Sequence, residues 1–226
     1  DQIIENTQVN FEQLDRIDKR LADYRKTEAK YGELIRAVTR AELIHALSEA
    51  LAPFMPTFMK LKNSKLGFLT DENGRRENFT YPVDTVRNCI VDALLMGLHP
   101  IGNEMNIIGG NMYATKDGLW RLCNEIPGLT ELQTFCDPPT YEEGARKVVV
   151  VVWAKYLLHG EEKKIKHTVP IRINRGMGDD AIIGKATRKI LERVFKAETG
   201  KLIASSDLED GVSAASAPRT AREMIG

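Results

Sequence analysis

The segment from Lys147 to Leu158 constrains the fold more than any other part of the chain. It contains five consecutive valines, followed by Trp153, Ala154, Lys155 and Tyr156. β-Branched residues are stiff at χ1 and pack well on a pleated surface, so such a run favours a β-strand. An uninterrupted apolar run indicates a strand that is buried on both faces, at least in its first half. The chain must therefore build a sheet around this segment.

The residues that follow predict a hairpin partner for this strand. Residues 159–162 have the composition of a turn, and apolar residues then alternate from Ile165 to Ile173. Because Pro170 has no backbone N–H, we expect the second strand to lie at a sheet edge. Such a hairpin would allow His159 and His167 to face each other as a structural pair. Upstream, the alternation over residues 129–135 predicts a third strand.

Helical periodicity surrounds the predicted sheet. Apolar residues recur every three or four positions over residues 11–24 and over about 27–51. The apolar stripe of the second segment comprises Leu34, Ile35, Val38, Leu43, Ile44, Leu47 and Leu51. Two interpretations stay open for these helices: a helical hairpin packed on the core, or an arm that docks on a neighbouring subunit. Further helices are expected over about 84–96 and about 181–198, the last with Asp179 or Asp180 as its N-cap.

Together these elements predict an α+β fold. We expect an antiparallel β-sheet with a long central hairpin packed by helices, a helical N-terminal arm and a flexible C-terminal tail. The arm is assigned to residues 1–60, the α+β core to 61–200 and the tail to 201–226. The tail is rich in Ser and Ala, so it has little apolar surface to bury.

The composition limits the classes of partner. The chain has 32 basic and 32 acidic residues, so nucleic-acid affinity would have to come from a local patch. Cys89, Cys123 and Cys136 form no Cys-x-x-Cys pair, and we expect core thiols rather than disulfides or a zinc site. Residues 148–153 form the longest apolar run, which is far short of the ~20 residues of a membrane span. We therefore expect a cytosolic protein without a signal peptide.

Enzyme signatures are weak in this sequence. The four histidines show no metal-ligand spacing, and neither Gly109-Gly110 nor Gly176-Met177-Gly178 continues as a phosphate-binding loop. Asp179-Asp180 with Glu161-Glu162 would suit a two-metal nuclease. However, adjacent acidic residues at the start of a helix are better explained by their favourable interaction with the helix dipole. We therefore expect no catalytic residues, no metal and no cofactor.

Residues 97–120 carry the most distinctive motif. Gly97-Leu98-His99-Pro100 is typical of a helix C-terminus, with Gly97 as the C-cap. A short hairpin is expected over 104–115 around Gly109-Gly110, and Thr115 to Asp117 would cap the next helix. This stretch predicts a compact scaffold without a catalytic constellation.

The same stretch resembles the RecT/Red beta family of phage single-strand annealing proteins. The shared features are Gly97-Leu98-His99-Pro100, the hairpin over 104–115, Asp117-Gly118 and Gly128-Leu129-Thr130, with matching order and spacing over residues 84–199. The resemblance implies ATP-independent binding of single-stranded DNA and annealing of complementary strands in recombination. It also implies homo-oligomeric rings or filaments, a partner exonuclease, the host single-strand binding protein as a partner, and a phage or prophage gene acting in the bacterial cytoplasm.

Basic residues of the last helix are the main candidates for DNA contact. At about 100° per residue, Lys185, Arg188, Lys189 and Lys196 fall on one arc with Glu192, and Arg193 lies at its seam. A phosphate backbone can follow such an arc, and the family keeps basic residues on its equivalent helix. Further candidates are Arg172, Arg175, Lys60, Lys62, Lys65, Arg75, Arg76 and, as an apolar wedge, Met177. Bases would need aromatic partners, for which Tyr113, Trp120, Trp153 and Tyr156 are candidates, although core packing is their commoner role.

Two other functions are compatible with the residues. The long N-terminal helices suit a protein-interaction or assembly module that does not bind DNA. A metal-dependent nuclease of a recombination system is the third possibility. Salt-sensitive DNA binding distinguishes annealing from assembly, and cleavage that depends on a divalent ion distinguishes the nuclease.

Overall fold

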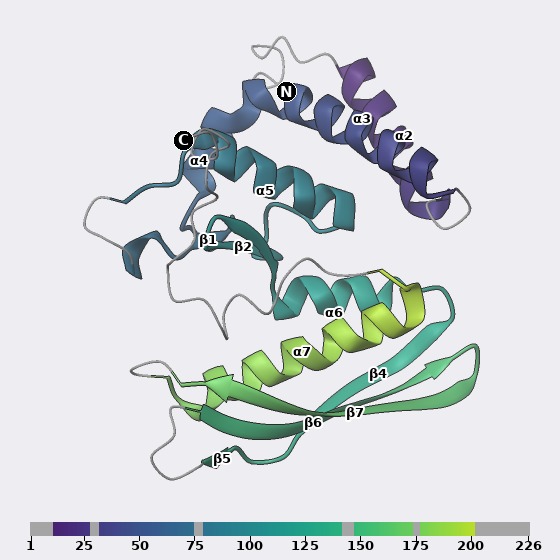
Figure 1. Cartoon of the computed structure of the whole chain (residues 1–226), viewed down its shortest axis with the longest axis vertical. Coiled ribbons are helices and arrows are strands. Elements are labelled where there is room, and N and C mark those ends of the chain that lie inside the picture. Colours follow the sequence, from purple (N-terminus) through teal and green to yellow (C-terminus); the bar gives the residue numbers. More distant parts are fainter. Residues whose placement is uncertain (1–10, 28–31, 75–78, 142–146, 174–176, 202–226) are drawn as a thin grey trace, which may run out of the picture. The chain divides into compact units, whose positions relative to one another are not determined.

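The computed structural model describes residues 11–27, 32–74, 79–141, 147–173 and 177–201 (Figure 1). The described residues form two compact units, one ending at Glu125 and the other starting at Ile126. The predicted α+β class with antiparallel sheets and a helical N-terminal region is confirmed. The predicted division at residues 60 and 200 stays a prediction, and residues 202–226 of the expected tail lie outside the described residues.

The first unit begins with helices and then forms a small sheet. Its helical elements are α2 (Phe11–Thr27), α3 (Glu33–Leu51), η2 (Ala52–Phe54), α4 (Met55–Leu61), η3 (Glu72–Gly74), α5 (Val83–Met96) and α6 (Lys116–Asn124). Its strands are β1 (Leu69–Thr70), β2 (Met105–Ile108) and β3 (Asn111–Ala114). The β2–β3 hairpin turns at Gly109 and Gly110, which both have positive φ, as the sequence predicted.

The N-terminal helices pack on α5. Their shared core comprises Ile17, Leu21, Tyr24, Leu43, Leu47, Val91 and Leu95. The helical hairpin on the core is therefore observed. The prediction that the apolar residues of the second helix form one packed stripe is wrong. Leu43 and Leu47 are buried, whereas Leu34 is 77%, Ile35 54% and Val38 51% exposed. The apolar residues of α3 are divided between a packed face and an outward face, because α2 and α5 cover only one side.

A short strand, β1, and a 3-10 turn, η3, lie between α4 and α5 in the sequence. β1 pairs with β2 in parallel, which gives the sheet order β1-β2-β3. Two paired residues are too few to produce a periodic signal in the sequence. The carboxylate of Glu72 connects three parts of the first unit. It accepts a hydrogen bond from the Tyr81 N–H at 2.6 Å and another from the Lys62 ammonium at 2.9 Å. Burial alone would raise the pKa of Glu72, but these contacts lower it.

The motif of residues 97–120 has a structural role. Gly97 caps α5 with φ of 91°, and the Thr115 hydroxyl accepts the Gly118 N–H at 3.2 Å, so both predicted caps are confirmed. Arg121 donates from Nε and Nη2 to the two carboxylate oxygens of Glu104 at 2.6 and 2.7 Å. It also donates to the Gly97 carbonyl at 2.6 Å. The bidentate ion pair therefore ties α6 to the loop before β2, and the hydrogen bond to Gly97 ties α6 to the end of α5.

The second unit is a sheet with one helix across it (Figure 1). Its elements are β4 (Leu129–Cys136), β5 (Thr140–Tyr141), β6 (Lys147–Leu158), β7 (Glu161–Arg172) and α7 (Asp179–Thr199). β7 pairs with β6 along its whole length, and β4 and β5 share the other edge of β6. The predicted central hairpin is confirmed, and Pro170 lies on an edge strand as expected.

The turn between β6 and β7 is shorter than predicted. His159 and Gly160 have φ of 52° and 85°, which is the pattern of a two-residue hairpin turn. Glu161 and Glu162 therefore belong to β7 rather than to the turn. The prediction that His159 and His167 face each other is wrong, because His167 is paired with Val152 and His159 lies in the turn.

Strand β6 is buried on one face only, which corrects the expectation of burial on both. Val148, Val150, Val152 and Ala154 are fully buried, whereas Val149, Val151 and Trp153 are half-buried. Helix α7 packs across β4, β6 and β7 on the buried face. The valine run thus reflects β-propensity as well as burial, since β-branched residues also suit a half-exposed pleat.

The start of α7 also differs from the prediction. Gly178 is the N-cap, and Asp179 and Asp180 lie in the first helical turn. There their negative charges interact favourably with the positive end of the helix dipole, but neither residue is the N-cap. The helix ends at Thr199, and Gly200 is its C-cap with φ of 69°.

We predict that Gly118→Ala destabilises the first unit. A Cβ at Gly118 would lie 2.5 Å from the Glu104 carbonyl oxygen and 2.7 Å from Leu98 Cδ2, so backbone and core would have to move. Overpacking of this kind costs about 1–3 kcal/mol. The matched control is Gly184→Ala in α7, where the new methyl meets nothing within 4 Å. That variant should be stabilised by about 0.4–1 kcal/mol. Urea unfolding midpoints measure both, and equal midpoints would contradict the close packing at Gly118.

Candidate nucleic-acid interface

Cations form a row along one edge of α7. Lys185, Lys189, Arg193 and Lys196 are spaced i, i+4, i+8 and i+11, which brings their side chains onto one narrow arc. Arg193 and Lys196 are exposed, and Lys185 and Lys189 are half-buried. We call these four residues the cationic row. Four of the predicted DNA-contact residues are thus brought together by one helix.

Arg188 does not belong to this row, although the sequence placed it there. Its side chain is only 4% exposed, and its Nη1 lies 3.4 Å from Glu192 Oε2. Leu191 and Phe195 are buried and lie three and seven residues further along, on the same side of the helix as Arg188. The packed surface of α7 is therefore wider than its apolar residues indicated. Arg193, predicted at the seam, takes the exposed position instead.

The row also influences the electrostatics of the neighbouring strand. His167 of β7 is half-buried, and its pKa is lowered first by burial and then by Arg193 and Lys189. A positive potential disfavours the protonated imidazole, so the shift indicates that the two cations lie close to β7. The edge where α7 meets β7 is therefore a locally positive region in a chain of zero net charge.

The predicted residues near the end of β7 are only partly placed. Arg172 is exposed and is the last residue of β7, and Met177 is half-buried just before the helix cap. Arg175 lies outside the described residues. Asp179, in the first turn of α7, accepts a hydrogen bond from the Tyr141 hydroxyl.

The second predicted basic cluster belongs to the first unit. Lys60 and Lys65 are exposed. The Lys62 side chain is 13% exposed, and its ammonium forms an ion pair with the buried Glu72, which gives Lys62 a structural role. Arg75 and Arg76 lie outside the described residues.

The aromatic candidates differ in accessibility. Tyr156 is 1% exposed, and its hydroxyl donates to Glu198 at 2.5 Å, so it belongs to the core. Tyr113, Trp120 and Trp153 are half-buried. Trp153 stacks on Phe135 of the neighbouring strand, with ring centroids 5.6 Å apart and an interplanar angle of 17°. Phe135 was absent from the predicted set and is 40% exposed.

Sequence reasoning also missed the basic residues around this aromatic pair. Lys147, Lys155, Lys164 and Lys166 are all exposed on β6 and β7. They occupy the positions that alternate with the buried residues of each strand. The period-two pattern of both strands was visible in the sequence, so their register would have identified this common face.

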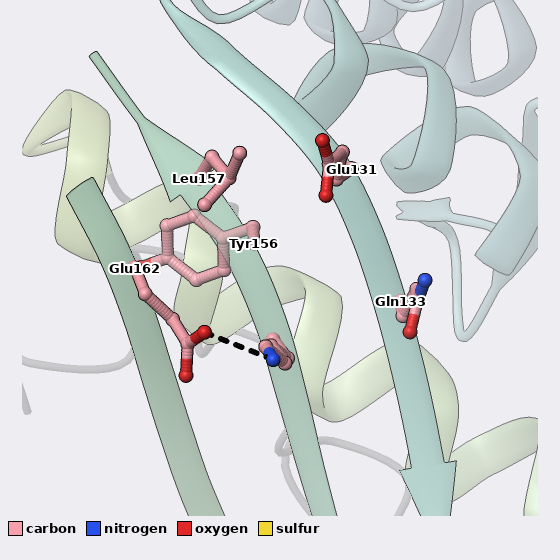
Figure 2. A pocket seen from close by; sticks show the side chains of 6 residues that line it. Glu131, Gln133, Tyr156, Leu157 and Glu162 are labelled. Atoms are coloured by element: carbon pink, nitrogen blue, oxygen red, sulfur yellow. Dashed lines mark ion pairs between the residues drawn. The ribbon is translucent and has the colours of Figure 1, made fainter. Parts of the chain in front are cut away.

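A small hollow lies at the turn end of the same sheet (Figure 2). It has a volume of about 100 Å³ and is lined by Glu131, Gln133, Lys155, Tyr156, Leu157 and Glu162. Lys155 Nζ and Glu162 Oε2 are 2.9 Å apart in it. Small-molecule sites usually have about 300–1,000 Å³, so the hollow is too small for such a ligand.

Neither a metal centre nor a membrane span is found in the part of the chain that the structure describes. Within these ranges, no group of three or more His, Cys, Asp or Glu side chains is arranged to hold a metal ion. Among the described helices, none is both long and apolar enough to cross a bilayer.

No family model matches the chain, and no curated protein or solved structure matches it significantly.

We predict that removing cations of the row raises the pKa of His167. Arg193→Ala and Lys189→Ala each remove one positive charge that disfavours the imidazolium, so protonation should become easier. Lys163→Ala on the same strand is the control and should leave the value close to that of the wild type. NMR titration of the histidine ring protons measures the change. An unchanged pKa in Arg193→Ala would show that the row does not act on β7.

Proposed function

We propose that this protein binds single-stranded DNA and anneals complementary strands without ATP, as a member of the RecT/Red beta type of recombination proteins. The cationic row of α7 is the observation that carries the proposal. A net neutral chain that gathers Lys185, Lys189, Arg193 and Lys196 on one edge of one helix has the local positive field that a phosphate backbone needs.

The proposed mechanism involves no bond chemistry. Each lysine or arginine that neutralises a phosphate releases condensed counterions, and this release drives binding of an extended strand. A strand held through its phosphates keeps its bases available to pair. A complementary strand would then anneal on the protein, driven by tighter binding of the product duplex.

An annealing assay across a salt series, without ATP, tests this proposal. One labelled oligonucleotide is added, then its complement or a non-complementary strand. A stable complex should form with the complement and weaken as salt rises. Lys189→Ala/Arg193→Ala should bind the single strand more weakly, and its slope of log K against log[salt] should be shallower by about 0.7 for each phosphate that the variant no longer neutralises.

The matched control for this test is Arg16→Ala/Lys19→Ala in α2. It removes the same charge from exposed positions that form intrahelical ion pairs. It should anneal as the wild type does. If the wild-type chain ignores both strands at low salt, or if the slope of the control falls as much as that of the α7 variant, the assignment to α7 is wrong.

A specific observation favours self-association through α3. Leu34, Ile35 and Val38 of α3 are more than half exposed, on a helix whose opposite face is packed. Clustered exposed apolar residues are typical of protein contact sites. We propose that this face contacts a second copy of the chain in a ring or filament. An assembly module without DNA binding is the alternative function that this face supports.

The test of the α3 face uses two substitutions of equal exposure. Leu34 and Leu66 are both 77% exposed, so Leu34→Asp and Leu66→Asp make the same chemical change in the same unit. Leu34→Asp should shift sedimentation to smaller species and weaken self-association about tenfold or more, because burial of one leucine contributes about 1.5–3 kcal/mol. Leu66→Asp should not. Identical sedimentation of the two variants would contradict the interface.

The cellular setting is part of the proposal. We place the protein in the cytoplasm of a bacterial host, encoded by a phage or prophage. A partner exonuclease would supply the single strands, and the host single-strand binding protein would be the second partner. The resemblance of residues 84–199 supports these assignments.

A further inference from the structure

We infer that the face of the β4–β6–β7 sheet opposite α7 is a second binding surface for single-stranded nucleic acid, on which unpaired bases stack. We call it the outward sheet face and define it by Phe135, Lys147, Trp153, Lys155, Lys164, Lys166 and Arg172. It takes its ligand class from the proposed function, but it shares no residue with the cationic row.

The strand register places these residues on one face. In antiparallel strands, directly paired residues point to the same side of the sheet. Trp153 is paired with Lys166 on β7 and with Phe135 on β4, and Lys155 is paired with Lys164. The alternate residues Val150, Val152 and Ala154 are buried on the side that α7 covers. The outward set therefore faces away from α7.

Like charges are directly opposed on this face. Lys147 is paired with Arg172, and Lys155 is paired with Lys164. Pairs of equal charge at directly opposed positions destabilise a sheet, so a chain selected only for folding would avoid them. Glu162 offsets part of the charge of Lys155 at the turn end, where Glu131 adds a second carboxylate. The rest of the face keeps an excess of cations that a polyanion would neutralise.

The aromatic pair gives this charge a specific ligand chemistry. Phe135 and Trp153 stack in parallel in the middle of the face, and Lys164 Nζ lies 5.9 Å from the centroid of the Trp153 ring. Phe135 is 40% exposed, so a planar ligand can reach the pair. Aromatic rings flanked by cations are the usual platform for unpaired bases and their phosphates. In a duplex the bases are already stacked on one another, so this face selects single strands.

The size of the face suits a short stretch of a strand. Lys164 and Lys166 are two residues apart on β7 and therefore roughly 7 Å apart along it, and neighbouring strands are about 4.8 Å apart. The cations thus surround the stacked rings on more than one side. A phosphate backbone crossing the strands would meet Lys164 or Lys166 while its bases reach Phe135 and Trp153.

The first experiment uses Trp153 itself as the reporter. The chain has two tryptophans, so Trp120→Phe leaves Trp153 as the single indole. We expect oligo-dT to quench its emission at low salt and added salt to reverse the quenching. A duplex of mixed sequence should quench it much less. Equal quenching by duplex and oligo-dT overturns base stacking on this face.

The second experiment separates binding from folding. Phe135→Leu should weaken binding of labelled oligo-dT roughly five- to a hundredfold, the loss expected when one base loses its stacking partner. Lys164→Glu should also weaken binding, yet its melting temperature should stay equal or rise, because a glutamate would then oppose Lys155. Lys163→Glu is the control, since it makes the same charge change at the neighbouring position of β7, which points to the other side of the sheet. It should bind as the wild type does.

The outcomes distinguish this inference from the proposed function. If Lys189→Ala/Arg193→Ala weakens oligo-dT binding while Phe135→Leu and Lys164→Glu do not, the outward sheet face is not a binding surface and the proposed function stands. If the wild-type chain fails to bind oligo-dT at low salt, both are overturned. If only the sheet variants lose binding, the inference stands and the cationic row loses its role.

Discussion

The pairing of β6 with β7 is the constraint on which the rest of the second unit depends. The two strands remain in register from Lys147 with Arg172 to Leu158 with Glu161, and a two-residue turn at His159-Gly160 fixes that register. A slip by one residue would exchange the two faces of the hairpin. The register thus places Val150, Val152 and Val169 beneath α7 and the lysines and Trp153 on the opposite side.

The two faces of one sheet give the unit two different chemical surfaces. On the covered side, α7 packs its apolar residues against the strands and carries the cationic row along its edge, close enough to His167 to lower its pKa. On the other side, a stacked aromatic pair lies among lysines. A strand held by phosphate contacts and a strand held by base stacking are different bound states. An annealing protein needs to hold one strand while it admits another, and two such surfaces on one unit would suit that task.

Much of the fold could be predicted from the sequence, because many of its elements are specified by local sequence patterns. The Gly97 helix end, the Thr115 cap and the Gly109-Gly110 turn each depend on a few neighbouring residues, and all were confirmed. The strand at the five valines was also confirmed, but its expected burial on both faces was not. The errors came from tertiary context. The burial of Arg188 depends on packing beside Leu191 and Phe195, and the exposure of Leu34 depends on which side of α3 its neighbours cover. The outward sheet face needed the register of three strands, which no single segment contains.

Amide chemical-shift mapping with oligo-dT at low salt tests the central claim, nucleic-acid binding by the second unit, most directly. We predict shifts in α7 and β7, at Lys189 and Arg193, and on β4 and β6 at Phe135 and Trp153, with the amides of α2 and α3 unchanged. Shifts confined to residues 11–125, or none at low salt, would contradict it.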